Sequence, residues 1–199
     1  LYKRTTDGLL YDYSVPTPPN AFSTTKANVG VMENKGVEIL VNATAVQKNK
    51  FSWLTGVTFS TNTNKLVSLS NDLYQTTNPW FNAGYTGSPI STYTHRIEVG
   101  KPIGNFYGYK VTGITDDGKW IYEDKNGNPS DTRVEDDKKI LGNGLPKYYA
   151  SWNNTMKYAK WDLNVTMRGA FGYKILNYQR MYTENLSNPA YNMLSSAFD

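Results

Sequence analysis

The chain has 199 residues, no cysteine and a formal net charge of +4, so disulfide bonds and cysteine-based metal sites are excluded. Its Lys and Arg residues are scattered rather than gathered into a basic stripe, which argues against nucleic-acid binding. The mean hydropathy is negative. No apolar run approaches the roughly 18 residues of a membrane helix, so any membrane crossing must be made by strands.

The first predicted elements are the tail of a strand at Leu1–Asp7 and, further along, a hairpin. The segment Asn34-Lys35-Gly36 is predicted as the turn that enters this hairpin, with a glycine free to take positive φ. Strands follow at residues 37–46 and 51–61, joined by the polar turn Gln47–Lys50. Because successive side chains of a strand point to opposite faces, alternation gives each strand one apolar face. The residues assigned to this face are Val37, Ile39, Val41, Ala43, Ala45, Phe51, Trp53, Thr55, Val57 and Phe59, with Leu40 and Val46 in the opposite set.

A second hairpin of the same design is predicted at residues 147–158 and 162–172, joined by the tight connection Ala159–Trp161. Period-two alternation again assigns one side chain in two to an apolar face. The residues of this face are Tyr148, Ala150, Trp152, Asn154, Met156, Tyr158, Leu163, Val165, Met167, Gly169 and Phe171.

Both hairpins have the features of membrane-spanning β-strands. The apolar faces contain no charged residue, whereas the opposite faces contain Glu38, Lys157, Asp162 and Arg168. Each strand has about 10 residues, the length of a tilted transmembrane strand, and large aromatic residues gather at the strand ends as in interfacial girdles. The fold is therefore predicted to be all-β, a transmembrane antiparallel β-barrel with long extracellular loops. Four long strands cannot close a barrel, so the chain is expected to be a fragment of a larger one.

The segment between the hairpins, residues 62–146, is predicted to be a long, irregular extracellular loop. It is rich in aromatic residues set among Asn, Thr, Ser and Gly, a mixture suited to stacking on sugar rings or to packing against a partner protein. Trp80, Phe81 and Tyr85 are the candidate substrate- or partner-binding residues, and the alternative is that they only pack the loop on itself. Asp116-Asp117-Gly118 is predicted to be a hairpin turn.

No catalytic or metal-binding residue is predicted. Asp124–Asp131 carries oxygen ligands that could surround Ca²⁺, but Pro129 stands where an EF-hand needs its turning glycine, so a solvated acidic hairpin turning through Asn126-Gly127-Asn128 is expected instead. His95 is the single histidine and has no nucleophile-elbow pattern near it. The chain is therefore not expected to be an enzyme or to hold a cofactor.

The last predicted element is a short external helix within Leu176–Leu194. Its Leu, Tyr and Met residues recur near helical spacing, and Asn188-Pro189 then breaks the run. The predicted order is therefore strand, hairpin, long loop, hairpin and helix.

Five motifs add a family resemblance to this pattern: Leu1–Leu10, Asn28–Glu38, Gly100–Tyr109, Asp137–Gly142 and Leu145–Lys147. In their order and spacing they resemble the late barrel region of SusC/RagA-type TonB-dependent outer-membrane transporters. The resemblance implies a barrel of about 22 strands in the bacterial outer membrane. It also implies an N-terminal plug and import of glycans or peptides, powered through TonB, together with a SusD-like surface lipoprotein. All 199 residues are assigned to this single barrel domain, and the plug and the TonB-contacting segment are expected to lie outside them.

Two other classes of protein remain as alternatives. A soluble β-rich carbohydrate-binding module would use the same aromatic residues, and it would differ by staying soluble without detergent. A structural surface or pilus-like protein would need strand-donation segments, and the sequence shows none.

Overall fold

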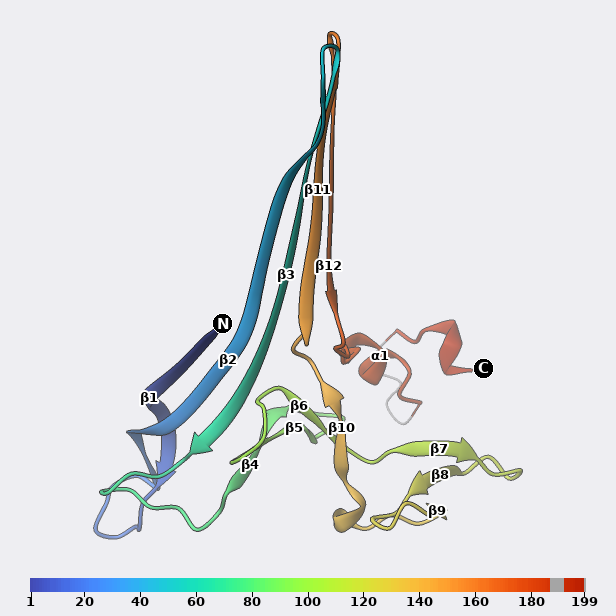
Figure 1. Ribbon diagram of the computed structural model, residues 1–199. Helices are drawn as coiled ribbons and strands as arrows, with labels where there is room; N and C mark the ends of the chain where they lie inside the picture. Colours follow the sequence, from blue (N-terminus) through green and yellow to red (C-terminus); the bar gives the residue numbers. More distant parts are fainter. Residues whose placement is uncertain (187–191, 199) are drawn as a thin grey trace. The chain divides into compact units, whose positions relative to one another are not determined.

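The structure is a computed structural model that describes residues 1–186 and 192–198 (Figure 1). The chain divides into two compact units. The long-strand unit comprises Leu1–Pro79, Val99–Pro102 and Leu145–Tyr173, and the short-strand unit comprises Trp80–Glu98, Ile103–Gly144 and Lys174–Asp199.

The long-strand unit is one five-stranded antiparallel sheet with the order β1-β2-β3-β11-β12. Its strands are β1 (Tyr2–Ser14), β2 (Thr24–Lys48), β3 (Phe51–Ser68), β11 (Tyr148–Tyr158) and β12 (Trp161–Phe171). β2 and β3 form the first predicted hairpin, β11 and β12 form the second, and the two hairpins pair directly through β3 and β11. In Figure 1 both tight turns lie at the same end of the long strands. The predicted all-β, antiparallel fold is confirmed, and the sheet in this fragment does not close into a barrel.

The strand register joins the apolar faces of both hairpins into one surface. Val41 lies opposite Val57, Val57 opposite Trp152, and Trp152 opposite Met167. One row along, Ile39, Phe59, Ala150 and Gly169 pair in the same way. Residues that pair directly share a face, so the faces predicted separately for the four strands are a single face of the sheet.

Two local predictions about β2 are wrong. A bulge at Ala45 adds one residue to β2, so Thr44 pairs with Leu54 but Val46 pairs with Trp53. An extra residue inverts the alternation, which moves Val46 from the predicted polar face to the apolar face. Asn34-Lys35-Gly36 is not a turn but continues β2, and Gly36 has no positive φ. This position suits glycine because a Cβ there would collide with the Thr61 carbonyl and the Tyr2 ring.

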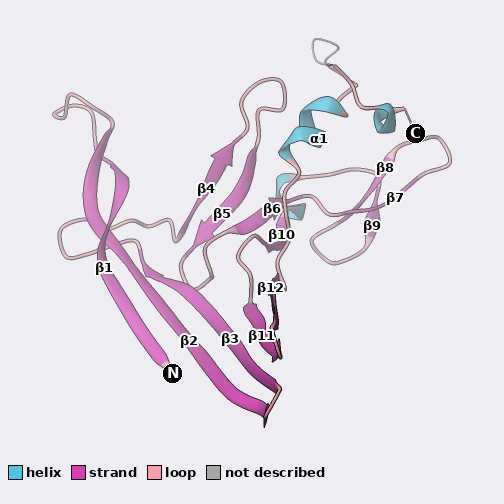
Figure 2. Cartoon of the chain, turned by 90° about the horizontal axis from the view of Figure 1, so that it is seen from above, coloured by secondary structure: helices cyan, strands magenta, loops and turns pink. Residues whose placement is uncertain are grey.

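The short-strand unit contains two small antiparallel sheets, with the orders β10-β6-β5-β4 and β7-β8-β9 (Figure 2). Their strands are β4 (Trp80–Tyr85), β5 (Tyr93–Glu98), β6 (Asn105–Gly108), β7 (Val111–Ile114), β8 (Trp120–Glu123), β9 (Pro129–Ser130) and β10 (Lys139–Asn143). The prediction of an irregular loop is therefore wrong for much of residues 62–146, because strands of two to six residues are too short to show an alternating pattern. The predicted turn at Asp116-Asp117-Gly118 does connect β7 to β8, with Gly118 at φ +81°.

The described residues of the short-strand unit also contain three short helical elements: η1 (Glu135–Asp137), α1 (Tyr178–Thr183) and η2 (Ser195–Ala197). α1 lies within the predicted helical segment, and Asn177 caps it by accepting a hydrogen bond from the Arg180 backbone N–H. The predicted break at Asn188-Pro189 lies outside the described residues. In the described part of the chain, no helix has the length and apolar character needed to cross a membrane.

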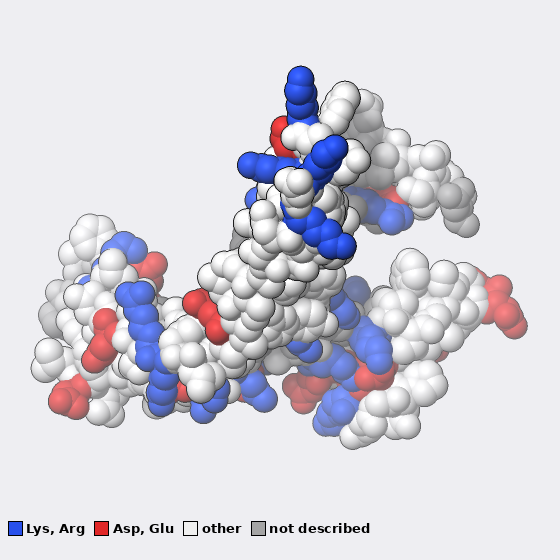
Figure 3. All heavy atoms as spheres, turned by 45° about the horizontal axis from the view of Figure 1, so that its top comes forward, with Lys and Arg blue, Asp and Glu red and all other residues white. Residues whose placement is uncertain are grey.

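The apolar residues of the long-strand unit are mostly uncovered. Its buried apolar side chains are Ala27, Val29, Leu66 and Leu69, all near one end of β2 and β3. By contrast, Val41, Leu163 and Met167 on the apolar face are each more than half exposed. Figure 3 shows the middle of the long strands as a largely uncharged surface, with basic residues gathered at the end of the short turns. A soluble sheet would bury such a face against a second layer.

Candidate functional site

The apolar face has an aromatic cluster at each end. At the end away from the tight turns, Tyr148 stacks between Phe59 and Phe171, with ring centroids 6.2 and 5.7 Å apart. At the other end Tyr158 pairs with both Phe51 and Trp161, next to the turns. The two clusters are ten residues apart along β11, or roughly 33 Å of strand, and a strand tilt of about 40° reduces this to about 25 Å. We call the surface between the clusters the apolar band; its height matches the hydrocarbon layer that a barrel spans.

Polar side chains inside the apolar band are paired with one another. The Trp53 indole N–H and the Thr55 hydroxyl both donate to Oδ1 of Asn154, each at 3.0 Å. The Trp152 indole N–H in turn donates to the Thr55 hydroxyl at 2.8 Å. Asn154 is only 4% exposed. An unpaired polar group costs several kcal/mol in hydrocarbon, so this network explains how an asparagine is accommodated on the apolar face.

The opposite face of the sheet is polar. Thr58 and Ser151 are joined by a hydrogen bond of 2.5 Å between their hydroxyls, and Ser151 pairs with Arg168. An open cavity of about 440 Å³ lies against β2, β3 and β11 and is lined mostly by polar residues, among them Asn42, Thr44, Asn153 and Thr155, together with Leu54. In a barrel, this is the composition of a surface that faces an aqueous lumen.

The structure does not bring the three predicted binding residues together on one face. Trp80, Phe81 and Tyr85 all lie on β4, and alternation puts Trp80 on one face of its sheet and the other two on the opposite face. Trp80 is 39% exposed and Tyr85 is 56% exposed. Tyr85 contacts Tyr93 across the strand pair, with ring centroids 5.1 Å apart.

Arg96, which the sequence pattern did not single out, stacks on Trp80. The Arg96 guanidinium lies 3.9 Å from the Trp80 ring centroid and 3.7 Å from that of Tyr107, so it is stacked between two aromatic rings. Its Nε also donates to Oδ1 of Asn82 at 3.3 Å. The only sequence signal for this arrangement was the aromatic content of Gly100–Gly113, because the strand pairing that brings the side chains together is not visible in the pattern.

A larger cavity lies within the short-strand unit. It has a volume of about 620 Å³, and its aromatic lining residues are Tyr93, Phe106, Tyr107, Tyr109, Trp120 and Tyr122. Arg133 also lines it, 5.2 Å from the Tyr109 ring centroid. Side chains of this kind contact sugar rings and peptide side chains equally well.

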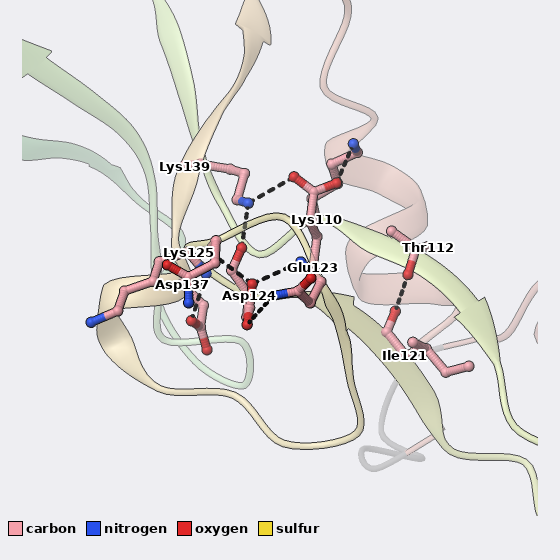
Figure 4. Close-up of polar contacts among 10 residues, drawn as sticks. Lys110, Thr112, Ile121, Glu123, Asp124, Lys125, Asp137 and Lys139 are labelled. Atoms are coloured by element: carbon pink, nitrogen blue, oxygen red, sulfur yellow. Dashed lines mark hydrogen bonds and ion pairs between the residues drawn. The ribbon is translucent and has the colours of Figure 1, made fainter.

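The acidic segment around Asp124 forms its own local structure (Figure 4). Asp124 Oδ1 accepts hydrogen bonds from the backbone N–H groups of Asn128 and Asn126, each at 2.8 Å, and these bonds lower the Asp124 pKa. The buried Asp137 accepts from the Lys125 and Val134 backbone N–H groups. These bonds fix the turn between β8 and β9, as the acidic-hairpin interpretation expects. That the segment binds no Ca²⁺ stays a prediction.

Glu123 at the end of β8 forms ion pairs with Lys139 of β10 and with Lys110, which directly precedes β7. Its carboxylate lies 2.5 Å from the Lys110 ammonium and 2.8 Å from that of Lys139 (Figure 4). Hydrogen bonds from the Lys110 ammonium, and to a smaller extent from the Lys139 ammonium, lower the Glu123 pKa below its ordinary value.

His95 has a packing role. Its ring shares a 2.8 Å hydrogen bond with the Thr94 hydroxyl and lies against the Phe106 ring.

Comparisons with known proteins add an independent line of observation. No protein-family model matches the chain. The chain is 29% identical over 195 residues to the TonB-dependent receptor P3 of Formosa agariphila, covering 89% of this chain and 18% of that protein. It is 26% identical over 196 residues to the TonB-dependent receptor SusC of Bacteroides thetaiotaomicron, covering 95% and 18%. The chain thus spans about a fifth of the length of these relatives, which are receptors rather than enzymes.

The fold is also that of a solved transporter. The structure of the RagAB peptide transporter matches with a TM-score of 0.72 at 22% identity, over 92% of this chain and 20% of that one. The RagAB peptide importer in its open-open state matches with a TM-score of 0.75 at 21% identity, over 92% and 19%. The resemblance found in the sequence motifs is confirmed by these relatives and by the fold: the chain is similar, over nearly its whole length, to a segment of SusC/RagA-type TonB-dependent transporters.

Proposed function

We propose that this segment forms part of the wall and external loops of an outer-membrane barrel that imports nutrients by a TonB-dependent route. The observation that carries the proposal is the apolar band, a charge-free surface between two aromatic clusters whose large side chains are exposed. In a barrel, such an exposed apolar surface faces the lipid of the membrane. On this proposal, all 199 residues belong to one barrel domain.

The partners and the substrate class belong to the same proposal. A SusD-like surface lipoprotein would cover the barrel, and TonB would act through parts of the transporter outside these residues. The substrates would be glycans or peptides. The support is the sequence likeness to SusC and the likeness in fold to RagAB, a peptide transporter.

Within the segment, we assign substrate or lipoprotein contact to Trp80, Phe81 and Tyr85. The stacking of Arg96 on Trp80 fixes the tryptophan ring before any ligand arrives, and preorganised aromatic residues lose little entropy on binding. Tyr85 is held in a similar way against Tyr93. Because the two rings lie on opposite faces of β4, one face can contact substrate while the other contacts the lipoprotein.

Alanine substitutions in the full-length transporter test this assignment. Trp80→Ala and Tyr85→Ala are compared singly for uptake, co-purification of the lipoprotein and heat stability of the barrel, with Phe22→Ala as a control for loss of an exposed aromatic residue. Trp80→Phe, which keeps a ring for stacking, should restore much of the activity lost in Trp80→Ala. Normal uptake and partner retention in both alanine variants, with normal assembly, would refute the recognition role.

Detergent dependence tests the proposal as a whole. The full-length protein should remain monodisperse only in detergent or in a lipid nanodisc, since the apolar band is otherwise exposed to water. A protein that stays soluble without detergent and binds oligosaccharides would instead be the soluble carbohydrate-binding module.

A further inference from the structure

Three lysines in two adjacent cross-strand rows border the apolar band on the same face of the sheet. Lys3 of β1 lies directly opposite Lys35 of β2, and in the next row Glu33 of β2 lies opposite Lys65 of β3. No register shift falls between Glu33 and Val37, so alternation places Lys35 on the face of Val37. We call Lys3, Lys35 and Lys65 the basic row.

The basic row carries more positive charge than its surroundings neutralise. Lys3 forms an ion pair with Glu33, with 2.6 Å between Nζ and Oε2. In the described part of the chain, Lys35 and Lys65 form no ion pair of their own. Like charges directly opposite one another destabilise a strand pair, and Lys3 and Lys35 are in that arrangement. An additional anion between the strands would remove this repulsion.

The position of the basic row indicates which anion this is. Lys35 precedes Val37 by two residues, or about 7 Å along the strand. Phe59 and Tyr148, in the aromatic cluster, mark the same margin of the apolar band. Lysine side chains can extend their ammonium groups along an apolar surface toward water. The ammonium groups of Lys3 and Lys35 therefore lie at the depth where the headgroup phosphates of a surrounding lipid layer begin, and Lys65 lies two residues further from the apolar band.

We propose that the basic row binds phosphate-bearing lipid headgroups at the outer margin of the membrane, on the side of the long loops. The proposal rests on the proposed function, because it requires the apolar band to meet lipid. The bound anion is a lipid headgroup rather than a transported substrate, because the basic row lies on the apolar face and the polar face is the one suited to a lumen. Glu33 competes with the headgroup for Lys3 and limits the affinity.

The test uses the full-length transporter in nanodiscs of phosphatidylcholine with and without phosphatidic acid. Lipid retained by the protein is measured by native mass spectrometry. The test variant is Lys3→Gln/Lys35→Gln/Lys65→Gln, and the matched control is Lys48→Gln/Lys50→Gln/Lys160→Gln, which removes the same charge at the tight turns. A lysine near an anionic surface contributes about a fivefold change in affinity. We therefore expect preferential retention of phosphatidic acid to fall on the order of tenfold or more in the test variant and to change much less in the control.

A further variant removes a negative charge beside the basic row and should have the opposite effect on lipid retention. Glu33→Gln removes the competing carboxylate and should increase retention of phosphatidic acid. Equal retention by the wild type and the test variant would overturn the proposal. The proposal would also be overturned if inorganic phosphate alone raised the melting temperature of the detergent-solubilised wild type as much as phosphatidic acid does, because that would show a free-anion site. Failure of every variant to enter nanodiscs would instead refute the proposed function.

Discussion

The indole N–H of Trp53 on β3 donates a 3.0 Å hydrogen bond to Oδ1 of Asn154 on β11. This bond joins two strands of different hairpins, and the Thr55 hydroxyl donates to the same oxygen. Asn154 therefore has a double role, because it satisfies two donors inside the apolar band and connects the hairpins. The effect of Asn154 on the stability of the apolar face therefore depends on its hydrogen bonds to Trp53 and Thr55.

Replacing Asn154 with Ala should destabilise the barrel by about 1–3 kcal/mol, because the Trp53 and Thr55 donors lose their acceptor in an apolar setting. Trp53→Phe should cost less, since Asn154 would keep its bond to Thr55. Heat- and urea-induced unfolding of the full-length protein in detergent measures both effects. Asn153→Ala, on the polar face, is the control and should change stability by no more than about 0.5 kcal/mol. Equal effects at positions 153 and 154 would contradict the role assigned to the network.

Arginine substitutions test which face meets lipid. Val41→Arg, in the middle of the apolar band, should cost about 2–4 kcal/mol, as charges do at the bilayer midplane. Thr166→Arg, on the polar face, should be much milder. Folding efficiency into lipid vesicles at increasing urea gives the comparison. Similar damage from both substitutions would indicate a sheet buried on two sides.

Labelling of introduced cysteines tests topology, and these 199 residues contain no other cysteine that could react. Because short turns face the periplasm in such barrels, Asn49→Cys should be protected from an impermeant thiol reagent in intact cells. Asn126→Cys, in the turn between β8 and β9, should be labelled. The reverse pattern would invert the proposed orientation, and permeabilised cells provide the control for reactivity at both positions.

The ion pairs of Glu123 predict an acid response in the short-strand unit. Since the folded state lowers the Glu123 pKa, the stabilisation is present above the ordinary glutamate pKa of about 4.3. It is lost as pH falls through the lowered value. Hydrogen exchange of β7 and β8, corrected for intrinsic rates at each pH, should therefore speed up on acidification.

The variant Glu123→Gln provides the matched control for this acid response. It lacks the ion pairs already at neutral pH, so its exchange should depend less on pH. The effect should be modest because exposed ion pairs contribute little. The same pH dependence in both proteins would show that other groups cause the response.

Alternation along β2, β3, β11 and β12 was enough to predict the hairpins and the apolar face, because side-chain direction in a strand depends only on neighbouring residues. Exceptions arose where the backbone departed from that period. The bulge at Ala45 moved Val46 to the apolar face, and continuous pairing carried β2 through Gly36. The turn residues at Asp116–Gly118 and Asn126–Asn128 indicated the hairpins of β7, β8 and β9, whereas β4, β5, β6 and β10 were missed because these strands of four to six residues show no regular apolar–polar alternation.

The sequence by itself determined which side chains of each long strand share a face, and its ordered motifs determined the family resemblance. Only the tertiary structure decided that β3 pairs with β11, that Asn154 meets Trp53, that Arg96 stacks between Trp80 and Tyr107, and that Lys3, Lys35 and Lys65 lie in two adjacent rows on one face of the sheet. These relationships join residues that are far apart in the chain. Strand register sets them, and no local period in the sequence records the register between distant strands.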